Sequence, residues 1–213
     1  MFCNYFPFLI QGYASCTALK TENVAISSGF YDINPQGIGF SSFKVYCDMT
    51  SKNGVGVTVI GHDSEAAMKV DGYERRGSYS RKIKYHLSIK RITAIISHSM
   101  KCEQFIKYQC FNSGLWFSTS PYAWWVSRQG TQMKYWGGAA VNSGKCACGM
   151  TNSCAGGGRC NCDKNDLILR EDSGFLTDKN TLPVTELRFG DTSTDAGFSE
   201  YGYHTLGKLL CWG

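Results

Sequence analysis

Short runs of alternating apolar and polar residues dominate the first part of the chain. Gly29–Ile33 and Phe43–Cys47 have the composition of strands and flank a turn at Pro35–Gly37. A third strand-like run, residues 55–60, follows Asn53–Gly54. Because Asn-Gly between β-rich runs favours a tight connection, the pattern predicts a hairpin there.

The next segments add strands and one helix. Tyr79–Leu87 alternates in part, as a half-buried strand does, and Cys102–Cys110 is a strand bracketed by cysteines. Between them, isoleucines at helical spacing follow Ser88, a residue that favours a helix N-cap, although a strand is the alternative. Leu167–Leu169 and Val184–Phe189 are predicted as further strands. The pattern therefore indicates a β-dominated chain with one or two short helices.

Lys145–Asp163 combines cysteine and glycine at a density that no helix or paired strand tolerates, so the segment is predicted to be irregular backbone. Such a segment is fixed either by disulfides or by a metal. Structural zinc sites use paired C-x2-4-C knuckles. The close pairs here are C-x-C, and the nearest downstream histidine is the distant His204. The spacing favours disulfides and therefore an oxidising compartment.

The composition fits one folded domain: 213 residues, 43% hydrophobic and 18% charged. No apolar run reaches the roughly 20 residues that span a bilayer. Residues 1–15 are interpreted as a weak or truncated secretion signal, or as the remnant of a longer parent chain. Removing them would remove Cys3 and leave ten of the eleven cysteines in a domain at 16–213.

Several motifs in order resemble a known family. SGFYDINPQG followed by FKVYCDMT resembles the opening of fibrinogen C-terminal-like domains. GVTVIGHDSE, CEQFIKYQC, KCACG, LPVTELRFGDT and the final LLCWG look like the contactin-associated (neurexin-IV) variant, and IKYQCFNSG is similar to the fibrillar collagen C-propeptide. The resemblance covers residues 16–213. It implies an α+β, β-dominated, disulfide-rich fold with short helices and long loops.

The resemblance also implies part of the disulfide map. Cys16 would pair with Cys47, and Cys110 with Cys146. The partners of the other six cysteines stay open, because six allow fifteen connectivities. These are Cys102, Cys148, Cys154, Cys160, Cys162 and Cys211.

Two polar segments contain residue types found in catalytic or metal sites. His62–Glu65 holds residue types that hydrolases use, but neighbours in an extended segment point to opposite faces, so a polar turn is the expected structure and no catalysis is predicted. Asp163, Asn165 and Asp166 resemble the calcium-binding run of fibrinogen-like domains. Lys164 inside that run departs from the pattern, so a solvated turn is the alternative to calcium.

Seven basic residues lie between positions 75 and 91, with no Asp or Glu among them. They form either a solvated face or a polyanion site for acidic glycans or sulfated polysaccharide. Nucleic acid is set aside, because a secreted disulfide protein rarely meets it. The seven are Arg75, Arg76, Arg81, Lys82, Lys84, Lys90 and Arg91. The Trp-rich stretch 116–136 is predicted to be mostly core.

These observations predict a non-catalytic extracellular recognition or adhesion module. It would be secreted or form the ectodomain of a membrane-anchored protein, and its loops at 145–166, called the cysteine loops below, would contact a cell-surface protein or glycan. One alternative is a lectin-like glycan-binding protein that uses calcium. The other is an assembly module like the collagen propeptide, which would form homo-oligomers.

Overall fold

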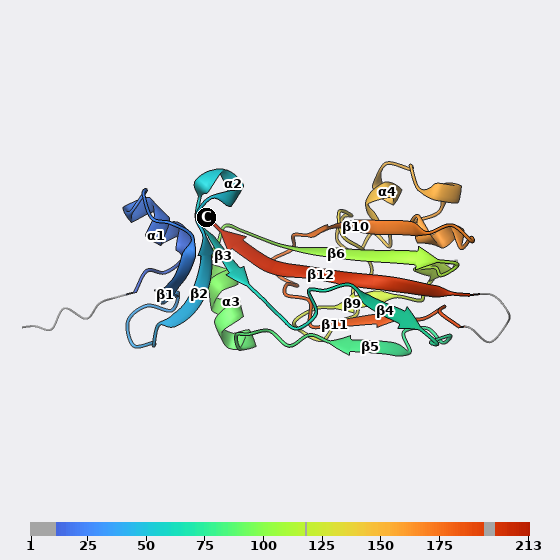
Figure 1. Ribbon diagram of the computed structural model, residues 1–213, viewed down its shortest axis with the longest axis horizontal. Helices are drawn as coiled ribbons and strands as arrows, with labels where there is room; N and C mark the ends of the chain where they lie inside the picture. Colours follow the sequence, from blue (N-terminus) through green and yellow to red (C-terminus); the bar gives the residue numbers. More distant parts are fainter. Residues whose placement is uncertain (1–11, 118, 194–198) are drawn as a thin grey trace, which may run out of the picture.

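Two long antiparallel strands, β6 (Lys101–Phe111) and β12 (Tyr201–Trp212), run through the middle of the molecule (Figure 1). The structure is a computed structural model that describes residues 12–117, 119–193 and 199–213. The main sheet has the strand order β1-β2-β3-β12-β6-β10, and β4 pairs with the other end of β12. Two smaller sheets have the orders β5-β11-β9 and β7-β8.

The described helices and strands are short apart from this central pair. The remaining strands are β1 (Gly29–Ile33), β2 (Phe43–Asp48), β3 (Val57–Ile60), β4 (Met68–Asp71), β5 (Tyr79–Lys82), β7 (Trp116–Phe117), β8 (Ser120–Pro121), β9 (Trp124–Val126), β10 (Arg170–Leu176) and β11 (Glu186–Phe189). The helices are α1 (Cys16–Glu22), α2 (Ser51–Gly54), α3 (Ile89–His98) and α4 (Ala147–Met150), with 3-10 turns η1 (Ala155–Gly157) and η2 (Cys162–Lys164).

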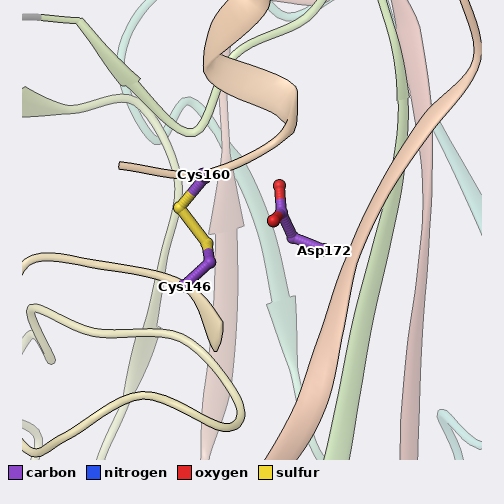
Figure 2. Close-up of side chains that lie close together, drawn as sticks. All are labelled: Cys146, Cys160 and Asp172. Atoms are coloured by element: carbon purple, nitrogen blue, oxygen red, sulfur yellow. A yellow bond between two sulfur atoms is a disulfide. The ribbon is translucent and has the colours of Figure 1, made fainter. Parts of the chain in front are cut away.

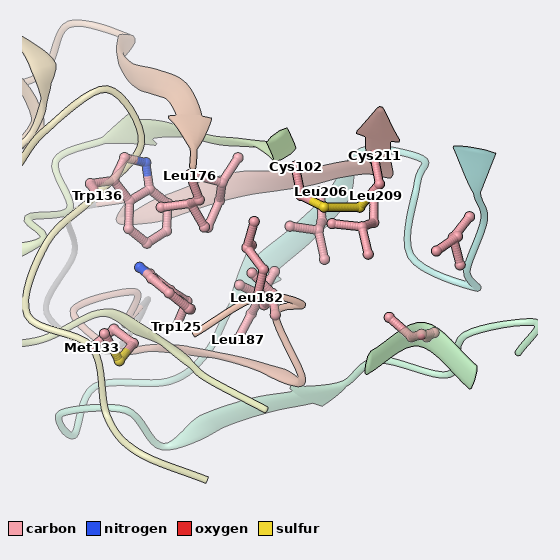
Figure 3. Packing of buried hydrophobic residues seen from close by; sticks show 14 of the residues in the cluster. Cys102, Trp125, Met133, Trp136, Leu176, Leu182, Leu187, Leu206, Leu209 and Cys211 are labelled. Carbon is pink, nitrogen blue, oxygen red and sulfur yellow. A yellow bond between two sulfur atoms is a disulfide. The ribbon is translucent and has the colours of Figure 1, made fainter. Parts of the chain in front are cut away.

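The core lies between the main sheet and the β5-β11-β9 sheet. Trp125 on β9 and Leu187 on β11 are fully buried together with Leu206 and Leu209 of β12 (Figure 3). The Cys102–Cys211 disulfide joins β6 to β12 at opposed positions beside this cluster. Trp116 and Trp136 are buried as well, whereas Trp124 is half-buried and residues 129–132 are exposed, so three of the tryptophans belong to the core but the stretch as a whole is not mostly core.

The amino-terminal elements form one end of the elongated molecule, and α4 with its loops lies at the other (Figure 1). Helix α1 begins after Ser15, whose hydroxyl accepts the Ala18 N–H at 3.1 Å. It packs directly on Gly56, where a Cβ would lie 2.5 Å from the Cys16 carbonyl oxygen, and the φ of +80° also favours glycine. Only glycine lets α1 approach this closely.

The sequence predicted several of these elements. Helix α3 begins after Ser88, whose hydroxyl accepts the Arg91 N–H, so the helix and not the strand is confirmed. Strands β1 and β2 pair, and β2 pairs with β3 in the predicted hairpin with Cys47 opposite Thr58. The connection is the four-residue turn α2 with Asn53 and Gly54 at positive φ. The predicted disulfide-rich, β-dominated α+β fold is confirmed.

Two predictions about local structure were wrong. Leu167–Leu169 is not a strand: the three residues are irregular, and pairing with β6 begins only at Arg170. The cysteine stretch is not wholly irregular, since it contains α4, η1 and η2.

The amino-terminal prediction falls mostly outside the described residues. These exclude Cys3 and most of the segment interpreted as a secretion signal. The boundary before Cys16 stays a prediction, and Tyr13 already belongs to the fold because its carbonyl accepts the Asn34 N–H at 2.7 Å. Within the described ranges, no helix has the length and hydropathy needed to cross a membrane.

Candidate functional site

All ten cysteines of the described ranges form disulfides. Three of these bonds hold the cysteine loops: Cys110–Cys162, Cys146–Cys160 and Cys148–Cys154. The other two join α1 to β2 (Cys16–Cys47) and β6 to β12 (Cys102–Cys211). The disulfide interpretation is therefore confirmed over the zinc interpretation, because sulfurs joined to each other provide no thiolate ligands.

The structure pairs Cys16 with Cys47, as the resemblance implied, but the implied Cys110–Cys146 pair is wrong. Cys146 bonds to Cys160 because their segments run together: the Cys146 N–H donates to the Arg159 carbonyl at 3.1 Å. Cys110 lies at the end of β6, against which η2 packs, and this contact brings Cys162 to it.

Two carboxylates bind the turn that carries Cys160 and Cys162. Asp163 accepts the Cys160 N–H at 3.0 Å and the Trp116 N–H at 2.9 Å. Asp172, on β10, accepts the N–H groups of Asn161 and Cys162 at 2.9 and 2.8 Å. Figure 2 shows the Asp172 carboxylate beside the Cys146–Cys160 disulfide. Neighbouring backbone N–H groups can bind an anion, and here those of Asn161 and Cys162 bind the Asp172 carboxylate while that of Cys160 binds Asp163.

Burial dominates the electrostatics of these two acids. It raises the pKa of Asp163 to about 6; the Asp172 charge adds to the rise, and the backbone N–H bonds oppose it. Burial likewise raises the pKa of Asp172, against the N–H bonds from Cys162 and Asn161. Sequence analysis missed Asp172, because nothing in a strand sequence shows that one side chain turns toward a distant loop.

The three residues predicted to bind calcium have other partners. Asp163 accepts backbone N–H groups as described, and Asp166 forms a two-bond ion pair with Arg170 at 2.7 and 2.6 Å. This pair, with Lys164 at 3.2 Å, lowers the pKa of Asp166 to about 2. The Asn165 Oδ1 is buried without a hydrogen-bond partner. Calcium at these residues stays a prediction, and an ion would compete with Arg170 for Asp166.

Directly after these residues lies an exposed apolar segment, Leu167–Ile168–Leu169, called the apolar loop below. Its side chains are 60%, 56% and 54% exposed. Its two ends are held, because the Asp166 carbonyl accepts the Asn112 N–H at 3.0 Å and Arg170 begins β10. The sequence pattern predicted a strand for this run. The adjoining cysteines and turn residues were the available signal that it lies in a loop.

The basic segment is divided between structural and exposed side chains. Arg76 donates to the Pro121 carbonyl, Arg81 pairs with Asp63 at 3.1 Å, and Arg91 lies over the ring of Phe43. The other four basic side chains are exposed, and no ion pair to them occurs within the described ranges: Arg75, Lys82, Lys84 and Lys90. Whether they bind a polyanion stays a prediction.

The polar segment His62–Glu65 forms a turn after β3, as expected. His62 is buried; its Nδ1 accepts the Ser64 backbone N–H, while the Ser64 hydroxyl donates to Asp63 at 2.9 Å. The imidazole therefore does not contact the serine hydroxyl that a hydrolase would activate. Burial also lowers the pKa of His62.

The fold and the cysteine loops together define an extracellular, disulfide-stabilised α+β domain. No protein-family model matches the chain. Curated relatives match 93% of it: Neurexin-4 of Drosophila melanogaster at 36% identity over 207 residues, and Contactin-associated protein 1 of Rattus norvegicus and Homo sapiens at 35% and 33% over 204 residues. The chain is therefore similar to one segment of these contactin-associated (neurexin-IV-type) proteins, which confirms the resemblance seen in its motifs. It covers 16% of the length of the fly protein and 14% of each mammalian one.

Proposed function

We propose that this domain binds a cell-surface protein through the apolar loop and the cysteine loops beside it. The neurexin and contactin-associated relatives are adhesion proteins, which supports extracellular recognition rather than catalysis. The observation that carries the proposal is the exposure of three consecutive aliphatic side chains on a fixed backbone. Exposed apolar groups that lie together mark protein contact sites more often than scattered ones do.

The rigidity of the surroundings supports this proposal. Cys110–Cys162 ties η2 to β6, and the Asp166–Arg170 ion pair spans the apolar loop from one side to the other. A loop held in this way loses little conformational freedom on binding, which leaves more of the contact energy for affinity. Burying the exposed halves of three aliphatic side chains contributes about 3 kcal/mol.

The experiment compares serine variants of exposed aliphatic residues. Leu167, Ile168 and Leu169 are replaced together by serine; the control replaces Val24 and Ile38, which are 76% and 82% exposed. Because the relatives are named for association with contactin, cells displaying contactin are the first partner to test. We expect the triple variant to lose binding on the order of 100-fold and the control variant to keep it.

Two results would overturn the proposal. One is unchanged binding by a triple variant whose disulfides and circular dichroism match the wild type. The other is self-association through the apolar loop, in which the wild type elutes as an oligomer and the triple variant as a monomer on a sizing column. The second result would favour the assembly-module alternative.

A further inference from the structure

A concave surface separate from the apolar loop lies on the part of the molecule formed by β1, β2 and β3, away from the α4 end (Figure 1). It is a cavity of about 490 Å³ whose wall includes side chains of β1 and β2 and whose rim includes His86 and Lys208. This volume is within the usual range for small-ligand sites. We call it the aromatic pocket.

Two solvent-facing aromatic rings form one wall. Phe30 on β1 and Tyr46 on β2 are opposed in the sheet, and their rings lie 5.4 Å apart, edge to face. They are 69% and 39% exposed, because alternation along β2 buries Phe43, Val45 and Cys47 on the other face. Because the two rings are edge to face, they present apolar surface to solvent at an angle to each other, and a ligand can pack against the face of one ring and the edge of the other.

Two lysines lie on the rim of the pocket. Lys44 is two residues from Tyr46 and therefore projects from the same face of β2. Lys208 and His86 line the pocket as well, against one acid, Glu65. One Glu65 oxygen accepts the His62 N–H at 2.8 Å, and the other lies 3.7 Å from the Lys208 ammonium group. Asp32 lies opposite Lys44 in the β1–β2 register and is exposed, so each of the two lysines has an acid nearby. The pocket thus combines an apolar wall with two ammonium groups, those of Lys44 and Lys208.

The backbone that carries this rim is fixed. The His86 N–H donates to the Gly61 carbonyl at 3.1 Å, and a Cβ on Gly61 would lie 3.1 Å from the His86 ring. His86 also continues an alternating row in which Lys82 and Lys84 face solvent. Of this row only His86 lines the pocket.

We propose that the aromatic pocket binds an acidic saccharide. The apolar face of a sugar ring packs on Tyr46 and Phe30, and a carboxylate or sulfate group on the sugar pairs with Lys44 and Lys208. Charge complementarity selects an anion, and the aromatic wall selects a ligand that also has an apolar face. A bare phosphate or an all-polar anion uses only half of this surface. The site is separate from the apolar loop, so this inference does not depend on the proposed protein partner.

The test measures binding of a sulfated heparin hexasaccharide by calorimetry at about 0.15 M salt, where surface charges are partly screened. We expect Lys44→Ala, Lys208→Ala and Tyr46→Ala each to weaken binding at least about tenfold. The matched controls are Lys101→Ala, an exposed lysine outside the pocket, and Tyr73→Ala, a tyrosine 40% exposed. Both controls should bind as the wild type does. A desulfated, carboxyl-reduced hexasaccharide should not bind.

Three results would overturn this inference. The first is no binding of the sulfated hexasaccharide. The second is equal weakening by Lys101→Ala and Lys44→Ala with no effect of Tyr46→Ala, which would show attraction by overall charge. The third is stronger binding of an acidic peptide than of the saccharide. The triple-serine variant of the apolar loop should keep saccharide binding, so failure of either proposal is distinguishable from failure of the other.

Discussion

Asp163 and Asp172 lie on either side of one turn and divide its three successive N–H groups between them. Asp163 comes from the turn itself, whereas Asp172 comes from the neighbouring strand β10. Their shared task is to hold the backbone between two disulfides, Cys146–Cys160 and Cys110–Cys162. The cysteine loops are thus held by hydrogen bonds to two buried carboxyl groups as well as by covalent bonds.

This arrangement makes Asp163 a source of pH-dependent stability. Its pKa is raised from 3.8 to about 6, so the folded state holds the proton more tightly than the unfolded state. Asp163 therefore contributes about 3 kcal/mol to the free energy of unfolding below pH 3.8, where it is protonated in both states. This contribution is lost as the pH rises through about 6. Denaturant unfolding at pH 5 and pH 7.5 should show a wild-type loss of about 1–2 kcal/mol that Asp163→Asn lacks. An identical pH dependence in the two proteins would contradict this assignment.

His204 gives stability the opposite pH dependence, because its pKa is shifted so that stability is lost as the pH falls. It is fully buried, stacks on Phe189 and contacts the Tyr79 hydroxyl through Nε2 at 2.9 Å. Burial lowers its pKa from 6.5 to about 4, so the neutral ring stabilises the fold above pH 6.5 and this contribution is lost as the pH falls toward 4. NMR titration of the His204 ring should find it neutral at pH 5.5, while exposed His86 serves as an internal comparison. A charged His204 at that pH would show that the imidazole is more accessible than its packing implies.

The disulfides should differ in their contribution to stability according to the loop that each closes. Cys110 and Cys162 are 52 residues apart, whereas Cys148 and Cys154 are 6 apart. Loop-closure entropy predicts a cost of about 4 kcal/mol for removing the first bond and about 2 kcal/mol for the second. Paired serine substitutions followed by denaturant unfolding measure both costs. Equal costs would show that chain entropy does not govern these bonds.

Calcium at Asp163, Asn165 and Asp166 is tested by ion removal. Arg170 already occupies both oxygens of Asp166, so a calcium ion would have to displace its guanidinium group. We therefore expect the same unfolding midpoint in chelator and in calcium. A rise with calcium that Asp166→Asn abolishes would establish the ion site and favour the lectin-like alternative.

The structural features that were predictable from the sequence are those set by residues close together along the chain. The α3 N-cap at Ser88 and the β2–β3 hairpin are local patterns, and their side-chain alternation is visible in the residues themselves. The family resemblance, and not a local pattern, supplied Cys16–Cys47, which joins α1 to β2 across 31 residues. The local patterns need only short-range information, and the structure has them.

The features that sequence analysis missed depend on contacts between distant segments. Cys110 pairs with Cys162 and not with Cys146, because η2 packs on β6. The spacing of the cysteines along the chain does not show how a glycine-rich loop packs. Leu167–Leu169 has the composition of a buried strand. It nevertheless lies outside the sheet, because β10 begins to pair with β6 only at Arg170 and β12 occupies the other edge of β6. The aromatic pocket likewise joins Phe30, His86 and Lys208, which come together only in the folded chain.

The position of β12 determines when the domain can be completed during synthesis. Strand β12 lies between β3 and β6, which do not pair with each other, and it comes after both of them in the sequence. Until residues 201–212 leave the ribosome, the main sheet exists only as two separate halves with open edges. Over the same interval Cys102 has no native partner, because Cys211 has not yet been synthesised. A thiol left unpaired for that long gives the oxidising machinery of the secretory compartment time to pair it wrongly, so correct folding of this domain depends on disulfide exchange after its last strand has arrived.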